Sequence, residues 1–486
     1  MLFNDNRLLF FDCRDIESMK GIRLTMNPPV KCGSCFFIEK EWEMKGTRGL
    51  CVVEWDGIFR FYYQLTLGEA KYLAVAFSTD GISWERPDLG RVEFSGSRSN
   101  NLIDIGEINQ NEACIFADPS APDEERFKLV GHSQYEGGMY AIGSPDGLGF
   151  ERQPGNLLPF ILDNHNTSFH DERIGRYVIY SRGWDRSRPI PPLEGSRTIV
   201  RIETDNLFAP VPYDDKAPDQ WPMSKKWEGL GHQDMRRVNR ELPTVLGPDD
   251  QDPPEADLYQ LAGVQYLPDA YLAFPSLYYH HPWAPEGFIN DGYLDLQFAS
   301  SRDGISWQRD FRGSYIRLDL PDGPCTKMMH MLVGMAPNGH RISQYYVGSR
   351  FSHGEGRVAA DVRAERPPAQ IGDPIAHRVE QRMDGFVSAD SDYTGGRLVT
   401  VPFVAGRGIA LNIDTSASGA ARAALLQEDG SPIGGYSIED SDLIQGSDTE
   451  YALRWRGQSD LSKLAGKRVK LELRSRSTKL YSVRPQ

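Results

Sequence analysis

The sequence predicts an all-β protein, a five-bladed β-propeller followed by a C-terminal β-sandwich. Three observations predict this fold class. One turn motif recurs along the chain, five hairpins rich in aromatic residues accompany it, and the pattern of the sequence changes after about residue 370.

The composition suits a chain of many short strands. The 486 residues include 47 glycines and 32 prolines, and stretches with helical periodicity are scarce. Apolar residues make up 40% of the chain and charged residues 25%, as in ordinary globular proteins. A chain of this length exceeds one ordinary core, so we expect two domains.

The recurring turn reads STDGISWER at 78–86, SPDGLGFER at 144–152 and SRDGISWQR at 301–309, with a degenerate copy at 203–208. The Asp side chain of such a turn can accept hydrogen bonds from backbone N–H groups, and the glycine supplies a positive φ. The aromatic ring that follows can cover the next strand. We therefore expect the motif to join two strands of a sheet and to take no part in chemistry.

A hairpin with aromatic residues in its second strand recurs five times. The hairpins lie at 49–64, 113–132, 167–184, 258–276 and 331–349. The first four precede a turn motif or another outer-strand pattern, so each reads as part of a four-stranded blade. The blades are expected at 47–105, 110–160, 164–212, 256–315 and 325–365, around a central pocket.

These blades predict a propeller domain over 1–368, with an N-terminal extension at 1–46 and a long insertion at 213–256. The insertion is too polar and too rich in proline for a blade, and we expect it to cover one face of the domain. Residues 369–486 alternate apolar and polar residues over short runs between Gly and Ser turns. This pattern is typical of an antiparallel β-sandwich.

The charge of the chain argues against two classes of partner. Its net charge is −14 and basic residues do not cluster, so we expect neither nucleic acid nor a membrane as partner. A neutral substrate such as a sugar fits better. The chain as written has no export signal and no run of eighteen apolar residues, which predicts a cytoplasmic protein unless a signal was trimmed. The sequence leaves open whether the protein forms a homo-oligomer.

Six cysteines are too few for a disulfide framework in so long a chain. Cys32 and Cys35 form a C-x-x-C pair, which is half of a zinc site or a redox pair in other proteins. No second pair accompanies them, so we expect ordinary thiols. We predict no metal site and no cofactor. The sequence leaves open whether a calcium ion binds on the axis of the propeller.

Four segments carry a resemblance to a known family. They read DNHNTSFHDERIGRYVIYSRGW at 163–184, YLAFPSLYY at 271–279, SRDGISWQR at 301–309 and LAGKRVKLELRSRSTKLYS at 464–482. They resemble a bacterial family of glycosyl-hydrolase-like five-bladed propellers, related to the fructofuranosidases (invertases and levanases) and arabinofuranosidases. The invertase signatures W-M-N-D-P-N-G, R-D-P and E-C are absent. The resemblance therefore implies the architecture and a glycosidase mechanism, but not the sugar.

In such propellers the side chains at the start of each innermost strand converge on the axis. Glycoside cleavage commonly needs two carboxyl groups, one protonated and one ionised. The acids that precede or begin the first hairpin strands are Glu43, Glu112, Asp163 and Asp257. We predict that the catalytic pair comes from these four, although any one of them can instead be a turn-forming residue.

Further residues are predicted to bind the substrate. Arg182 and Trp184 follow an inner strand, and a guanidinium beside an indole suits the hydroxyls and the apolar face of a sugar. Trp184 can equally fill space between blades. The other predicted substrate-binding residues are Trp42, His165, Asn166, Tyr259, His281 and His330. His281 belongs to a rim loop in which a surface role is favoured over a metal shared with His280.

Two functions follow from these patterns. The first is a glycoside hydrolase that removes a terminal sugar, such as a fructofuranosyl or arabinofuranosyl unit, in an exo mode. The second is a carbohydrate-binding propeller without catalysis, since a fold does not fix a function.

Overall fold

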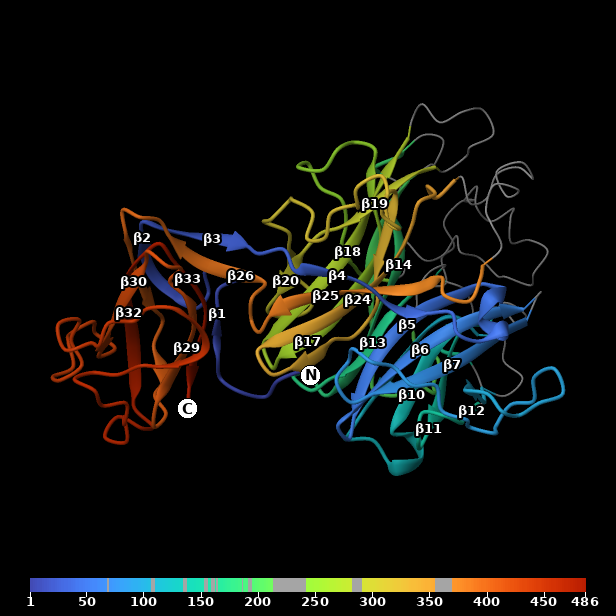
Figure 1. Cartoon of the computed structure of the whole chain (residues 1–486), viewed down its shortest axis with the longest axis horizontal. Helices are drawn as coiled ribbons and strands as arrows, with labels where there is room; N and C mark the ends of the chain where they lie inside the picture. The colour runs from blue at the N-terminus through green and yellow to red at the C-terminus, as the bar shows by residue number, and fades with distance from the viewer. Residues whose placement is uncertain are drawn as a thin grey trace. The chain divides into compact units, whose positions relative to one another are not determined.

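The computed structural model describes residues 1–67, 70–105, 110–133, 138–152, 156–158, 162, 165–185, 187–190, 195–212, 242–281, 291–354 and 369–486. These residues form many strands, and their helical segments are two short 3-10 turns, η1 (Glu41–Lys45) and η2 (Asp123–Glu125). The chain is therefore all-β, as the sequence predicts (Figure 1). No helix in the described residues is long and apolar enough to span a membrane.

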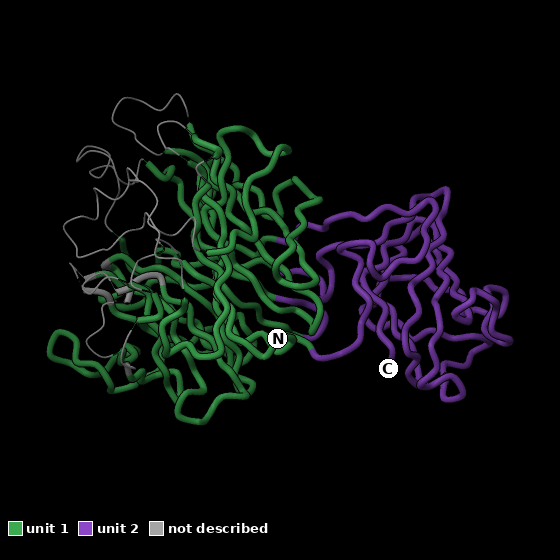
Figure 2. The backbone as a smooth tube through the Cα atoms, turned by 180° about the vertical axis from the view of Figure 1, so that it is seen from behind, with its two compact units in different colours: residues 1–3, 31–338, 343–379 green, residues 4–30, 339–342, 380–486 purple. Residues whose placement is uncertain are grey.

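The chain divides into two compact units (Figure 2). Unit 1 contains residues 1–3, 31–338 and 343–379, and unit 2 contains residues 4–30, 339–342 and 380–486. The sequence assigns residues 4–30 to an extension of the first domain, whereas the structure groups them with unit 2. The reason is strand pairing, since β2 (Ile16–Lys20) and β3 (Ile22–Met26) pair with strands of unit 2.

Unit 1 contains five antiparallel sheets, each built largely from one stretch of chain. The first sheet contains β5 (Thr47–Trp55), β6 (Ile58–Leu67), β7 (Ala70–Ser78) and β8 (Leu102–Ile103). The second contains β9 (Gln110–Ala117), β10 (Phe127–Ser133), β11 (Met139–Ser144) and β12 (Glu151–Arg152). The third contains β13 (Thr167–Asp171), β14 (Arg176–Asp185), β15 (Ser196–Thr204) and β16 (Thr244–Leu246). Thus β16 comes from the predicted insertion, of which 213–241 lie outside the described residues.

The last two sheets of unit 1 have five strands each. The fourth contains β17 (Ala256–Leu267), β18 (Ala270–His280), β19 (Gly292–Leu296), β20 (Ala299–Ser301) and β21 (Trp307–Gln308). The fifth contains β22 (Met328–Met331), β23 (Ala336–Asn338), β24 (Arg341–Ser349), β25 (Pro374–Arg382) and β4 (Val30–Phe37). Because β4 pairs with β25, the fifth sheet joins an early segment to a late one.

The first strands of these sheets are hydrogen bonded to one another in sequence. The junctions are Cys51 Sγ to Ile115 O (3.5 Å), Cys114 Sγ to Ser168 O (3.7 Å), Thr167 Oγ1 to Leu261 O (2.6 Å), Gln260 Nε2 to Met331 O (3.3 Å) and Val52 N to Val333 O (2.8 Å). The last of them returns from the fifth sheet to the first, where the bridge between Cys51 and Val333 is parallel. The five junctions therefore link β5, β9, β13, β17 and the segment that follows β22 into a closed series.

The later residues of the same strands share one cavity. It has a volume of about 200 Å³ and is lined by residues 1–2, 52–54, 115–117, 168–169, 263–265 and 333–335. The backbone N–H groups of Leu2 and Phe3 donate to Gln265 O (2.8 Å) and Tyr266 O (2.9 Å), which holds residues 1–3 at this end. Because the late residues of all five strands meet here, their early residues meet at the opposite end.

The recurring turn joins neighbouring sheets as well as neighbouring strands. The carbonyl oxygens of Gly81, Gly147 and Gly304 each accept a hydrogen bond from a tyrosine hydroxyl of another sheet. The donors are Tyr345 of β24, Tyr62 of β6 and Tyr180 of β14, in the same order. Within each turn the Asp Oδ1 accepts two backbone N–H groups, as the motif predicts. The repeat thus has a structural role, and we call the hydrogen bond between each turn and the tyrosine of the other sheet a clasp.

Alanine at position 147 tests this clasp. The φ of Gly147 is +72°, and an added Cβ would lie 2.5 Å from the Tyr62 hydroxyl oxygen. Gly57 is a matched control, because its φ is +74° and an added Cβ there meets nothing within 4 Å. Gly57→Ala is expected to lower the free energy of unfolding by about 1 kcal/mol, from its positive φ alone. Gly147→Ala should lower it by about 2 kcal/mol more, because overpacking is added. Urea titration measures both, and equal losses would contradict the clasp.

Unit 2 contains two antiparallel sheets that contribute to one apolar core. One sheet contains β2, β27 (Gly396–Thr400), β28 (Phe403–Val404), β30 (Ala420–Leu426) and β32 (Arg468–Arg476). The other contains β1 (Leu8–Leu9), β3, β26 (Val387–Ser391), β29 (Ile409–Asp414), β31 (Ser447–Ala452) and β33 (Thr478–Pro485). Leu411, Leu425 and Leu471 are fully buried in the core, and the Trp455 indole donates to Ala423 O at 2.9 Å.

Candidate functional site

The early ends of the five linked strands bring together a set of residues that we call the head layer. It consists of Arg48, Glu112, His165, Tyr259 and His330, one residue for each sheet of unit 1. Each precedes by two or three positions a residue that makes a junction to a neighbouring strand. Similar offsets, of two or three residues, along linked strands that run the same way place residues at about one level. The side chain of Glu112 lies outside the described part of the chain.

Two histidines of the head layer have unsatisfied ring nitrogens. His165 is 4% exposed, and its Nε2 has no hydrogen-bond partner among the described residues. The same holds for Nδ1 of His330, whose ring is partly exposed. Burial, reinforced by the charge of Arg48, lowers the pKa of both imidazoles to about 3. Both rings are therefore neutral at physiological pH.

Tyr259 is the centre of an aromatic and cationic cluster. Its ring centroid lies 5.2 Å from that of His330, and its hydroxyl lies 3.0 Å from Nε2 of His353. The guanidinium carbon of Arg182 lies 4.7 Å from the Tyr259 ring centroid, and Nε of Arg182 donates to Tyr259 O at 3.1 Å. The structure therefore brings the predicted residues Arg182, Tyr259 and His330 together.

Trp184 supports this cluster from below the surface. It is 4% exposed, and its ring lies under two guanidinium groups, with centroid distances of 5.8 Å to Arg182 and 5.0 Å to Arg197. Arg182 and Trp184 both come from β14, two positions apart, so their side chains leave the same face of the strand. The indole thus packs against both guanidinium groups, and a contact between Trp184 and a substrate stays a prediction.

Asp257 forms a buried ion pair next to the cluster. Its Oδ2 accepts hydrogen bonds from Nη1 of Arg197 (2.8 Å) and from Nε2 of His280 (3.0 Å), while its Oδ1 has no partner among the described residues. Burial alone would raise the pKa of Asp257, but Arg197 and His280 together lower it to about 2. The carboxylate is fully buried and stays ionised at physiological pH.

Glu43 does not join the head layer. The 3-10 turn η1 precedes β5 and directs this buried side chain to Nε of Arg86 (2.7 Å), the hydroxyl of Tyr63 (2.6 Å) and backbone N–H groups. Arg86 is the arginine that ends the first turn motif. The arginine that ends the third copy, Arg309, pairs in the same way with buried Asp252, in the loop that precedes β17. Glu43 therefore anchors a loop.

Glutamine at position 43 separates anchoring from catalysis. Glu43→Gln removes the charge that faces buried Arg86, so we expect the free energy of unfolding to fall by about 3 kcal/mol. Turnover per folded molecule should stay within about threefold of wild type, because Glu43 lies outside the head layer. A hundredfold loss of turnover in folded protein would contradict this placement.

The remaining predicted site residues are placed as follows. Trp42 packs beside Phe94 with ring centroids 6.4 Å apart, in the apolar cluster of the first sheet. Asn166 is fully buried and donates to Val130 O at 3.1 Å. His281 packs edge-on against Tyr293 at 4.5 Å. These three residues make structural contacts, and Asp163 lies outside the described residues.

Three residues that the structure places near this cluster were not predicted from the sequence, namely Arg48, Arg197 and His353, because the predictions depended mainly on acidic residues at strand starts. His280, which was predicted to lie in a rim loop beside His281, also belongs to this neighbourhood. Arg48 had a signal, since it precedes Cys51 by the offset at which His330 precedes Val333. Among the described residues, no group of three or more His, Cys, Asp or Glu side chains is arranged to hold a metal ion.

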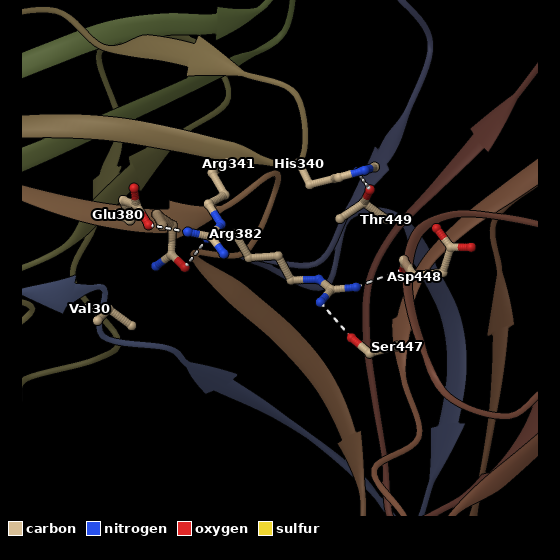
Figure 3. Close-up of a pocket in the computed structure, with 9 residues that line it drawn as sticks. Val30, His340, Arg341, Glu380, Arg382, Ser447, Asp448 and Thr449 are labelled. Atoms are coloured by element: carbon tan, nitrogen blue, oxygen red, sulfur yellow. Dashed lines mark hydrogen bonds and ion pairs between the residues drawn. The ribbon is translucent and has the colours of Figure 1, made fainter. Parts of the chain in front are cut away.

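Unit 2 contains a groove of about 510 Å³ that does not resemble a ligand site (Figure 3). Arg382 donates to Ser447 Oγ (2.8 Å) and Asp448 O (2.7 Å), and Arg341 pairs with Glu380 at 2.6 Å. The polar groups of the groove are thus largely satisfied by one another. None of the nine described residues that line it is Phe, Tyr or Trp.

Comparisons with known proteins give structural similarity alone. No protein-family model matches the chain, and no curated protein matches it. An N-acetylgalactosamine deacetylase from F. plautii, in complex with blood group B trisaccharide, is 11% identical with a TM-score of 0.43, and the match covers 76% of this chain and 97% of that protein.

Two glycoside hydrolases also resemble this chain in structure, again with low TM-scores and identities. A thermostable family-43 glycoside hydrolase is 13% identical with a TM-score of 0.36, over 71% of this chain and 93% of its own. A glycosyl hydrolase from Bacteroides ovatus is 9% identical with a TM-score of 0.39, over 73% of this chain and 97% of its own. At such low scores and identities, the activities of these proteins do not transfer to this chain.

Proposed function

We propose that unit 1 is a five-bladed β-propeller and that unit 2 is a β-sandwich. The hydrogen bonds that link the first strands of five sheets in a closed series support the propeller. The cavity lined by all five strands lies where a propeller has its axis. The shared core of the two sheets in unit 2 supports the sandwich.

The head layer then lies at the mouth of the axis and forms a carbohydrate site. A sugar presents hydroxyl groups and an apolar face, which polar side chains and partly exposed rings can bind together. Tyr259 and His330 supply partly exposed rings, and His165 supplies a hydrogen-bonding nitrogen that has no partner in the described part of the chain. This convergence is the observation that carries the proposed function.

Hydrolysis of a terminal glycosidic bond is the reaction that this site supports best. It needs a proton donor and an ionised carboxylate. Asp257 is ionised, so it fits the second role and not the first. Glu112 belongs to the head layer by its backbone position, which makes it the first candidate for the donor, and Asp163 is the second. Fructofuranosides and arabinofuranosides are the first substrates to examine.

One observation favours a second candidate function, carbohydrate binding without catalysis. Arg197 and His280 both engage Asp257, as is usual for a carboxylate that holds two sheets together. If Asp257 only holds the two sheets together, it does not act as the ionised carboxylate that hydrolysis needs. The propeller would then retain a sugar site and lack turnover.

Glutamine at position 112 tests the hydrolase. Glu112→Gln should lower turnover by about 10²–10⁴-fold while sugar affinity is kept, because an amide cannot transfer the proton. The assay is sugar release from a panel of furanosides and pyranosides, with Glu43→Gln as the matched control. Unchanged turnover in Glu112→Gln would reject Glu112 as donor. Wild-type protein that binds sugars without turnover would establish the second function.

A further inference from the structure

Asp257 differs from two other carboxylates of unit 1 that pair with buried arginines, Glu43 and Asp252. Both oxygens of Glu43 accept hydrogen bonds, and so do both oxygens of Asp252, as suits groups that anchor a loop. In Asp257, Oδ1 is buried and has no partner in the described part of the chain, and Oδ2 accepts from the imidazole of His280 as well as from Arg197. A buried polar atom without a partner costs about 1–3 kcal/mol, so Asp257 calls for a role besides anchoring.

The contact with Asp257 defines which ring nitrogen of His280 carries the proton. An ionised carboxylate can only accept a hydrogen bond, so Nε2 is the protonated nitrogen in the 3.0 Å contact. Nη1 of Arg197 lies farther from Nε2, at 3.3 Å, and donates to Asp257 at 2.8 Å. The hydrogen bonds that join this ring to described residues all involve Nε2. Nδ1 therefore has a lone pair that can take a proton.

His280 lies at the same end of unit 1 as the head layer. It ends β18, whose last residues pair with the first residues of β17. Its ring centroid lies 4.1 Å from that of Tyr278, which itself lies 5.7 Å from Tyr259 and 5.1 Å from His353. Asp257 is fully buried, whereas His280 is 7% exposed. The carboxylate cannot touch a substrate, so its charge can act on one only through the imidazole.

We propose that His280 is the general base of the proposed hydrolysis and that Asp257 positions it. Nδ1 takes a proton from a water molecule, whose oxygen bonds to the anomeric carbon as the bond from that carbon to the leaving oxygen breaks. The leaving oxygen takes a proton from the acidic donor, for which Glu112 is the first candidate. Solvent then removes the proton from Nδ1 and restores that of the donor. The steps add one water molecule across one glycosidic bond.

The charges around His280 fit this step. The carboxylate of Asp257 stabilises the imidazolium that forms when Nδ1 takes the proton, and it also balances the charge of Arg197. The other titratable groups near the ring are Tyr278, His353 and Asp291. Burial raises the pKa of Tyr278, so its hydroxyl stays neutral. The inference rests on the proposed function and predicts that the released sugar has inverted anomeric configuration, because water attacks directly.

Wild-type protein tests the dyad without a substrate. In the full chain with ¹⁵N-labelled histidine, the neutral ring of His280 should show a proton on Nε2 and none on Nδ1, with His280→Gln used to assign its resonances. A neutral ring with its proton on Nδ1 would overturn the inference, because that nitrogen would have no lone pair to offer.

Glutamine at position 280 tests the base in turnover. His280→Gln can keep a donor where Nε2 lies and has no proton acceptor in place of Nδ1. We expect kcat to fall by about 10²–10⁴-fold with KM within about threefold of wild type. The fall in activity that wild type shows toward acid pH, as the base is protonated, should be absent from the remaining activity. His170→Gln is the control and should change neither, because Nδ1 of His170 lies 3.9 Å from buried Asp118 at the late end of β13.

The outcomes separate this inference from the proposed function. Turnover that His280→Gln retains but Glu112→Gln loses would overturn the base and leave the hydrolase intact. A released sugar with retained configuration would do the same. Wild type without turnover on any sugar would reject the hydrolase and the inference with it. Should His280→Gln fail to fold, the ring protonation and the anomeric configuration measured with wild type decide.

Discussion

Asparagine at position 257 is expected to lower the free energy of unfolding by about 3–5 kcal/mol, because it removes the carboxylate charge that pairs with the buried guanidinium of Arg197. Both side chains are almost fully buried, and their closest atoms are 2.8 Å apart. Arg197 belongs to the third sheet of unit 1 and Asp257 to the fourth, so the pair holds two sheets together. Urea unfolding of Asp257→Asn measures the loss.

Two control variants separate burial from charge pairing. Glu380→Gln removes an ion pair with Arg341, whose side chain is 69% exposed, and should cost less than about 1 kcal/mol. The double variant Asp257→Leu with Arg197→Met should recover most of the stability lost in Asp257→Asn, because it removes both charges at once. A loss below 1 kcal/mol in Asp257→Asn would contradict the buried pair.

Acid should destabilise the protein through His165, well above the pH at which carboxylates are protonated. The folded pKa of His165 is about 3, because of burial and the charge of Arg48, against about 6.5 in an unfolded chain. Between these values the unfolded state binds a proton that the folded state does not bind. The contribution of neutral His165 to the free energy of unfolding is therefore complete above pH 6.5. It falls by about 1.4 kcal/mol per pH unit as the pH drops toward 3.

The measurement is the free energy of unfolding at several pH values between 7 and 4. Wild type should show a steeper pH dependence than His165→Gln, and the difference in slope should approach about 1.4 kcal/mol per pH unit. His340→Gln is the control, because His340 is exposed and hydrogen bonded to Thr449. Equal slopes for wild type and His165→Gln would show that His165 is not held neutral.

The strands of this protein were predictable because local chemistry defines them. Each copy of the turn contains an Asp that binds its own backbone and a Gly with positive φ, and these signals are independent of the rest of the chain. The pairing of β2 and β3 with strands near the C-terminus was not predictable. Such pairing depends on contacts between segments hundreds of residues apart, and these leave no local pattern.

The site was predictable in part for a related reason. His165, Tyr259 and His330 were found because they lie in or just before the first strands, within a few residues of those that make the junctions. Glu43 lies within the 3-10 turn η1, which directs its side chain to Arg86 and Tyr63 and not to the head layer. Its partner Arg86 ends the first copy of the turn motif, and Arg309 of the third copy also pairs with an acid. An ion pair between each motif arginine and an acid was therefore an available prediction.

A crystal structure of the protein soaked with mono- and oligosaccharides tests the central claim most directly. The predicted result is a sugar whose oxygens lie within hydrogen-bonding distance of Nε2 of His165 and Nδ1 of His330, with Tyr259 in contact. A sugar bound only in unit 2 or on the outer strands of unit 1, with the head layer unoccupied, would contradict the claim.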